Sequence, residues 1–165
     1  MTFGVGKAGR AMILHLAPDD DFFECIIRAC KEANFEHAAM TTCIGSLKKI
    51  NYSYAERSNE SPFGLAYLTR RTYEGAIQII SIEGVICKGE NGEYLPHFHV
   101  CFITDDGETR SGHIFDEGTP VFSTMEICLQ EVAEITVDRR MDSYYKVPIL
   151  YAGVKEGSGN VSRNG

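Results

Sequence analysis

A short turn, Asp105-Asp106-Gly107, separates two segments of strand-like composition, residues 100–104 and 109–115. In the common three-residue hairpin loop, a type I turn is followed by a residue in the left-handed conformation, which is usually glycine. Gly107 stands at that position, so Thr104 is expected to pair with Glu108. The turn therefore predicts an antiparallel hairpin with a fixed register, and the rest of the fold has to accommodate this hairpin.

This register has a direct consequence for three of the five histidines of the chain. His99 falls opposite His113, and directly opposed residues have β-carbons about 4.5–5.5 Å apart. His97 lies two residues along the same strand, so its side chain emerges on the same face. A two-residue loop at Asp106-Gly107 would instead turn His113 to the other face. The glycine position favours convergence of the three imidazoles.

Three histidines with an open fourth position are typical of a catalytic zinc site. A zinc ion in such a site lowers the pKa of a bound water or polarises a substrate carbonyl. Iron, manganese or nickel fit the same ligands. The alternative interpretation is that His97, His99 and His113 are ordinary, half-buried polar residues on strands.

Glu126 is the candidate catalytic acid or base. It lies in the apolar run "FSTMEICL", where a carboxylate needs a partner. It could accept a hydrogen bond from a ligand imidazole or transfer a proton. The alternative is an ion pair with Arg10, Arg139 or Arg140.

The rest of the pattern predicts an α+β fold, mostly antiparallel sheet with one or two packed helices. Residues 10–17 have the composition of a first strand, and the acidic residues of "PDDD" precede a helix with one apolar face that ends near Asn34. A long β-type run at 76–87 contains Gly84, which indicates a bulge or a close backbone approach. We expect a flexible arm at 1–9, a single domain at 10–152 and a disordered tail at 153–165.

Charge and cysteine content limit the partners. The formal net charge is −7, whereas a broad nucleic-acid surface needs clustered lysine and arginine. The six cysteines include no C-x-x-C pair and lie mostly in apolar runs, which is typical of reduced core residues. No apolar run is long enough for a membrane helix, and the first residues do not resemble a signal peptide. We therefore expect a cytoplasmic protein without a membrane partner.

Four segments together resemble the PPC domain (plants and prokaryotes conserved): "GSLKKINYSY", "IISIEGVIC", "PHFHVCFITDDGETRSGHI" and "FSTMEICL". His97 and His99 match the H-x-H motif of that family. His113 matches its last histidine, which Ser111-Gly112 precedes here in place of Gly-Gly, and Ile80 replaces a leucine. The resemblance covers nearly the whole chain, without an AT-hook.

The resemblance implies a homotrimer. It also implies that His97, His99 and His113 of each chain bind a metal ion, with zinc as the first candidate. It also implies a fold similar to that of acetolactate decarboxylase, whose zinc sits on three histidines. The expected function is that of a metal-binding protein, with an enzymatic role as a metal-dependent lyase or hydrolase on a small polar substrate. The alternative is a DNA-binding or gene-regulatory scaffold, because prokaryotic members are often labelled DNA-binding. The net charge does not support DNA as a partner.

Overall fold

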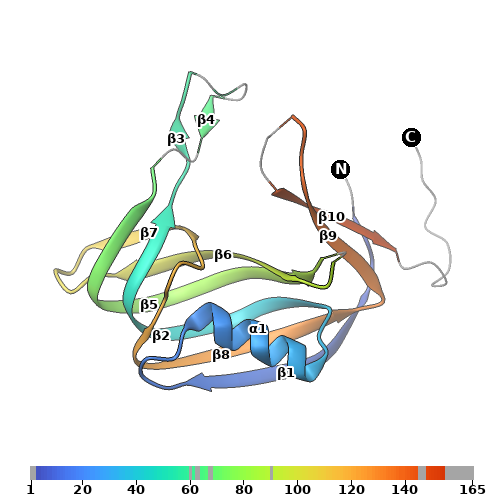
Figure 1. The fold of residues 1–165 in the computed structure, drawn as a ribbon, viewed down its shortest axis with the longest axis horizontal. Coiled ribbons are helices and arrows are strands. Elements are labelled where there is room, and N and C mark those ends of the chain that lie inside the picture. The colour runs from blue at the N-terminus through green and yellow to red at the C-terminus, as the bar shows by residue number, and fades with distance from the viewer. Residues whose placement is uncertain are drawn as a thin grey trace.

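The computed structural model describes residues 3–59, 61, 64–66, 69–89, 91–144 and 148–154. Most of these residues lie in antiparallel strands, with one helix, α1, packed against them (Figure 1). The elements in chain order are β1 (Lys7–Leu16), α1 (Phe22–Ala33), β2 (His37–Ser53), β3 (Glu56–Arg57), β4 (Leu65–Ala66), β5 (Arg71–Lys88), β6 (Tyr94–Ile103), β7 (Thr109–Ile114), β8 (Val121–Ala133), β9 (Ile135–Met141) and β10 (Pro148–Val154). The predicted α+β class is confirmed.

Six strands form the main sheet in the order β1-β8-β2-β5-β6-β7. The long strand β2 pairs with β8 and β5, and its last residues also pair with β7. Strands β2, β5, β6 and β7 therefore close into a ring. The closure places Ser53 at the end of β2 directly opposite His113 of β7.

Helix α1 begins and ends where its capping residues predict. Asp21 is the N-cap, and its carboxylate accepts hydrogen bonds from the backbone N–H groups of Phe23 and Glu24. The same carboxylate accepts from the backbone N–H of Thr119 at 2.7 Å, which ties the start of the helix to the segment before β8. Asn34 ends the helix in the left-handed conformation, with φ of 53°.

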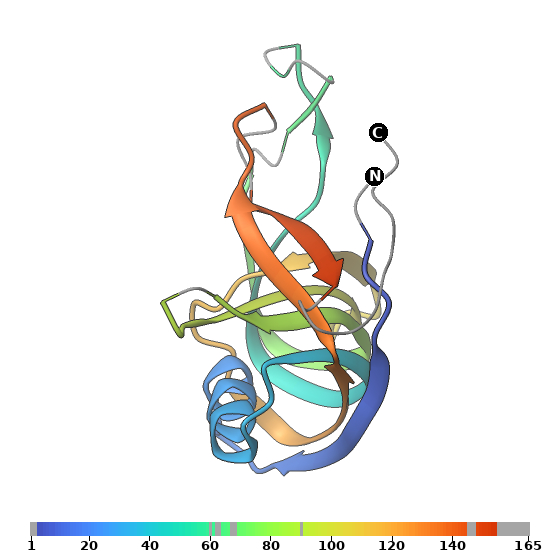
Figure 2. The same ribbon diagram turned by 90° about the vertical axis from the view of Figure 1, so that its right-hand side faces the viewer.

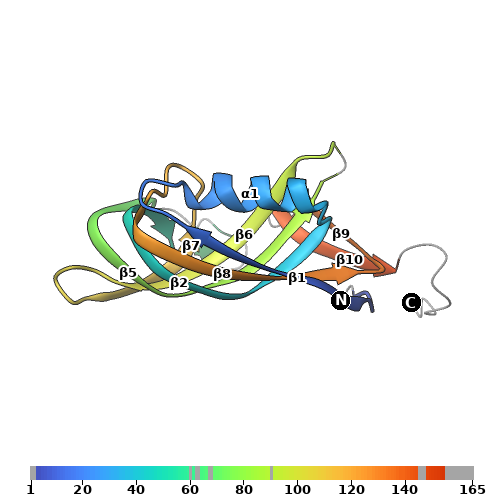
Figure 3. The ribbon, with the colours of Figure 1, turned by 90° about the horizontal axis from the view of Figure 1, so that it is seen from below.

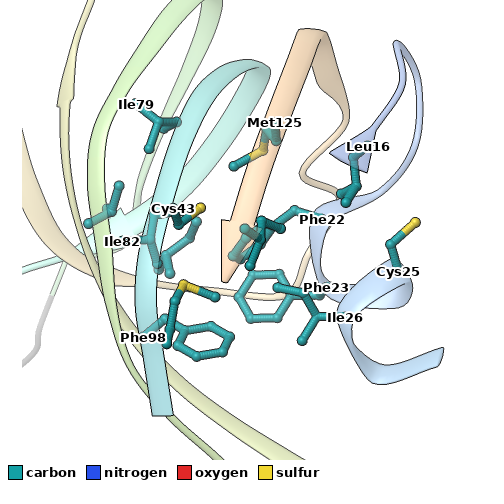
Figure 4. Close-up of a cluster of buried hydrophobic side chains, with 14 of the residues drawn as sticks. Leu16, Phe22, Phe23, Cys25, Ile26, Cys43, Ile79, Ile82, Phe98 and Met125 are labelled. Atoms are coloured by element: carbon teal, nitrogen blue, oxygen red, sulfur yellow. The ribbon is translucent and has the colours of Figure 1, made fainter. Parts of the chain in front are cut away.

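The core lies between α1 and the curved sheet. Figure 3 shows the helix on one side of the strands, and Figure 4 shows Phe22, Phe23 and Ile26 of α1 directed toward Phe98 and Met125. The ring of Phe22 packs edge-on against that of Phe98, with centroids 5.9 Å apart. Because neighbouring strand residues point to opposite faces, burial of Phe98 against α1 turns His97 and His99 to the other face.

Gly84 confirms the predicted close approach of two strands. It lies opposite Phe98 in the β5–β6 pairing and has φ of 146°. A β-carbon at this position would stand 2.0 Å from the carbonyl oxygen of His97. The close approach of β5 to β6 therefore requires glycine at this position. This approach also sets the position of the backbone that carries His97.

The described strands extend beyond the predicted domain bounds, residues 10–152, at both ends. Strand β1 begins at Lys7, inside the segment expected to be a flexible arm. Strand β10 runs to Val154 and pairs with β9, while residues 155–165 of the expected tail lie outside the described residues. Figure 2 shows the β9–β10 hairpin extending from the main sheet on the side away from α1. In the described part of the chain, no helix has the length and apolar character needed to cross a membrane.

Candidate metal centre

The β6–β7 hairpin has the register that its turn predicts. The backbone N–H of Thr104 donates to the carbonyl of Glu108 at 2.9 Å, and that of Gly107 donates to the carbonyl of Thr104 at 2.9 Å. Gly107 has φ of 84°, the left-handed conformation expected at the end of this loop. The pairing then runs to His99 opposite His113. The glycine thus selects the three-residue loop over the two-residue alternative.

His97, His99 and His113 lie together on one face of the hairpin. Each offers one ring nitrogen, and these nitrogens all lie within 4.8 Å of one another. The ring centroids are 5.1 Å to 5.5 Å apart, and the planes are tilted or edge-on rather than stacked. This is the arrangement in which three nitrogen lone pairs can point at one central atom.

The donor set fits a divalent transition metal. Two nitrogens bound to one zinc ion at about 2.0–2.1 Å lie at most about 4.2 Å apart. Shifts of less than about 1 Å would therefore bring the nitrogens of His97, His99 and His113 to bonding distance. His99 is exposed, whereas His97 and His113 are half-buried.

Ser53 provides a second observation that fits a metal. Its side chain is 1% exposed, and its hydroxyl oxygen has no hydrogen-bond partner among the described residues. Ser53 pairs directly with His113, so the two side chains leave the sheet on the same face. A metal-bound histidine almost always donates its other ring N–H to an acceptor. The Ser53 hydroxyl is therefore the candidate acceptor for the ring N–H of a metal-bound His113.

Burial makes two of the imidazoles neutral at physiological pH. Burial is the main cause that lowers the pKa of both His97 and His113 to about 4. The nearby Arg139 guanidinium and neighbouring imidazoles contribute smaller parts of the same lowering. Because a metal binds the neutral imidazole, these two ligands would not have to lose a proton first.

Glu83 faces the histidines, whereas Glu126 does not. Glu83 on β5 pairs directly with His99 on β6. Glu126 lies on β8, where it pairs with His15 and Ile44, and its exposed side chain accepts a hydrogen bond from Thr124 at 3.2 Å. The apolar run around Glu126 arises because its two neighbours in the chain point into the core while Glu126 points outward.

The expected ion pairs of Glu126 are also absent from the described residues. Arg10 pairs with Glu131, and Arg140 pairs with Asp138. Arg139 donates to the backbone carbonyls of Pro96 at 3.1 Å and Pro148 at 3.3 Å. Arg139 therefore lies beside the histidines, because Pro96 immediately precedes His97.

A cavity of about 360 Å³ opens next to the histidines. It lies where β7 leaves β6, since the β6–β7 pairing stops at His99 and the start of β6 has no partner on that side among the described strands. The residues that line it include His113, Phe115, Pro96, Arg139, Met141 and Pro148. The β9–β10 hairpin thus supplies one wall of a space that reaches His113.

The family model of the Plants and Prokaryotes Conserved domain, abbreviated PPC or PCC, matches residues 3–133. The chain belongs to this family. The match ends at the last residue of β8, so the β9–β10 hairpin lies beyond it. None of the proteins with curated functions matches the sequence significantly.

Solved structures share the fold. A metal-containing protein from Archaeoglobus fulgidus is 19% identical, with a TM-score of 0.75, and the match covers 90% of this chain and 98% of that one. A plant- and prokaryote-conserved protein from Pyrococcus horikoshii is 24% identical, with a TM-score of 0.73 and coverage of 94% and 99%. A putative DNA-binding protein from Ralstonia eutropha is 16% identical, with a TM-score of 0.66 and coverage of 84% and 88%.

Sequence reasoning did not identify Ser53, Glu83 or the place of Arg139. Ser53 reaches the site only through the long-range pairing of β2 with β7. Glu83 would have followed from the β5–β6 register, but the turn "KGENGE" is too long to fix a register by its length alone. The position of Arg139 follows from the β9–β10 hairpin, and the sequence contains no short turn motif that would predict this hairpin.

Proposed function

We propose that the protein holds one divalent transition metal ion, zinc in first place, on His97, His99 and His113. The observation that supports this most strongly is that the three ring nitrogens lie within 4.8 Å of one another on one face. Three imidazoles with an open fourth position suit zinc. The description of the Archaeoglobus relative as metal-containing agrees with the proposal.

The proposed activity is that of a metal-dependent lyase or hydrolase acting on a small polar substrate. When bound, a zinc ion in such a site polarises a carbonyl or lowers the pKa of a water molecule. In this proposal Ser53 accepts the N–H of His113 and fixes the orientation of its ring. Glu83, opposite His99, is placed to accept or return a proton at the exposed side of the group. The acid–base role of Glu126 stays a prediction, without a contact to the histidines.

We also propose that the protein assembles with copies of itself, as a homotrimer, in the cytoplasm. Four large apolar side chains of the main sheet are exposed, Ile13, Ile44, Ile80 and Phe122, and they come from four different strands. Exposed apolar side chains on neighbouring strands are typical of a surface that another chain covers. The six cysteines are free thiols, as is usual for proteins of a reducing compartment.

A DNA-binding role is the weaker second candidate. The Ralstonia relative is described as a putative DNA-binding protein, which is the observation that favours it. Against it, the net charge is −7, and several arginines each pair with a carboxylate, namely Arg10, Arg70, Arg71, Arg110 and Arg140. Paired arginines of this kind contribute little net positive potential to attract phosphates.

Metal analysis of protein purified without a histidine tag tests the proposal. We expect about one equivalent of a transition metal per chain, removed by dialysis against a chelator and restored by zinc. Restored zinc should also raise the melting temperature, because a ligand that binds only the folded state stabilises it. Protein that carries no metal and neither binds nor is stabilised by added zinc would contradict the proposal.

A further inference from the structure

Arg139 is a half-buried cation to which the described residues offer no carboxylate. Two of its N–H groups donate to the backbone carbonyls of Pro96 and Pro148. Its Nε atom is buried and has no hydrogen-bond partner within the described part of the chain. The adjacent Arg140 differs in both respects, because it is exposed and pairs with Asp138 at 2.6 Å.

A partly buried guanidinium without a counterion is energetically costly, because removal of the charge from water has to be offset by a partner. Burial lowers the pKa of Arg139, which expresses the same cost. An arginine nevertheless stays protonated at physiological pH. An anion would offset this cost, and it would have to bind the terminal nitrogens of Arg139, because the Nε atom is buried.

Arg139 shares a cavity with a proposed metal ligand. Both Arg139 and His113 line the space of about 360 Å³ at the open edge of β6. Ligand sites have volumes from about 300 Å³ upward, so this space suits a small molecule. Phe115 lines the same cavity, and its ring lies 4.8 Å from that of His113. A ligand here would meet an aromatic wall, a cation and one histidine of the group, His113, together.

We propose that this cavity binds a small organic monocarboxylate, with its carboxylate on the Arg139 guanidinium and its remaining polar group directed toward the histidine centre. The inference rests on the proposed metal site and names the chemical class of its ligand. A planar guanidinium matches a carboxylate with two parallel N–H···O bonds, which a neutral group cannot reproduce.

The other charged residues of the cavity limit the ligand to one negative charge. Glu93 and Asp116 also line it. Their carboxylates would repel a second carboxylate on the same ligand, whereas a hydroxyl or carbonyl group faces no such penalty. Arg139 lies beyond residue 133, the end of the family match, so this specificity comes from the β9–β10 hairpin of the chain.

Isothermal titration calorimetry with zinc-loaded protein tests the inference on matched probes. Lactate and pyruvate are each compared with the uncharged amide of the same shape, lactamide and pyruvamide. We expect the carboxylates to bind about 10–100-fold more tightly than the amides, since hydrogen bonds to charged groups are about twice as strong as neutral ones. The Arg139→Met variant should lose this preference, and Arg139→Lys should keep part of it.

Arg140→Met is the matched control, because it removes the same charge from the adjacent, exposed position; it should keep the full preference. Zinc content is measured first on every protein. A wild-type protein that does not take up added zinc overturns the metal proposal, on which the inference rests. A zinc-loaded wild type that binds none of the probes, or binds acid and amide equally, overturns the inference alone. Should Arg139→Met fail to hold zinc, Arg139→Lys decides: an undiminished preference for the acids in that variant also overturns the inference.

Discussion

Replacement of both His97 and His113 by alanine is expected to weaken zinc binding by about four orders of magnitude. Zinc sites with four protein ligands bind with about 10–16 kcal/mol, which is on the order of 3 kcal/mol for each ligand. Loss of two ligands therefore removes about 6 kcal/mol, or about a 10⁴-fold change in affinity. Competition with a chromogenic chelator of known affinity measures the change in both proteins.

His15→Ala is the matched control for this experiment. His15 lies exposed on β1, opposite Glu126 and outside the histidine group. Its replacement should leave zinc affinity unchanged, and the double variant should keep the far-ultraviolet circular dichroism spectrum of the wild type. Equal zinc affinity in the double variant and the wild type would place any metal elsewhere in the chain.

Alanine at Gly84 is expected to lower the free energy of unfolding by about 3 kcal/mol or more. The positive φ of 146° is strained for any residue with a β-carbon, at about 1–3 kcal/mol. The new β-carbon would also stand 2.0 Å from the carbonyl oxygen of His97, so β5 and β6 must move apart. Urea unfolding measures the loss, and zinc affinity should fall with it because the backbone at His97 shifts.

Gly107→Ala separates the two contributions. Gly107 also has a positive φ, at 84°, but no atom lies within 4 Å of the position of its β-carbon. This variant should therefore lose only the conformational part, about 1 kcal/mol. Equal losses at Gly84 and Gly107 would show that the close approach of β5 to β6 contributes nothing to stability.

The local part of the candidate site could be predicted because one short turn fixes it. Gly107 selects the loop, the loop sets the register, and the register places His99 opposite His113. Each step depends only on residues that are close in the sequence. The same holds for α1, whose capping residues Asp21 and Asn34 are adjacent to its ends.

The surroundings of the histidines could not be predicted, because they depend on pairings between distant segments. Ser53 meets His113 only because β7 closes onto the end of β2, a segment far away in the chain. Glu126 shows the opposite error, because an apolar stretch suggests burial on both sides of a strand. In fact β8 alternates between buried and exposed residues, and the Glu126 side chain is directed outward.

Anomalous diffraction from crystals of the untagged protein, recorded on both sides of the zinc absorption edge, tests the central claim most directly. We expect one strong peak per chain, surrounded by ring nitrogens of His97, His99 and His113 at about 2.0–2.1 Å. Crystals grown with added zinc that show no peak among these rings, or a single peak held by other residues, would contradict the proposed metal centre.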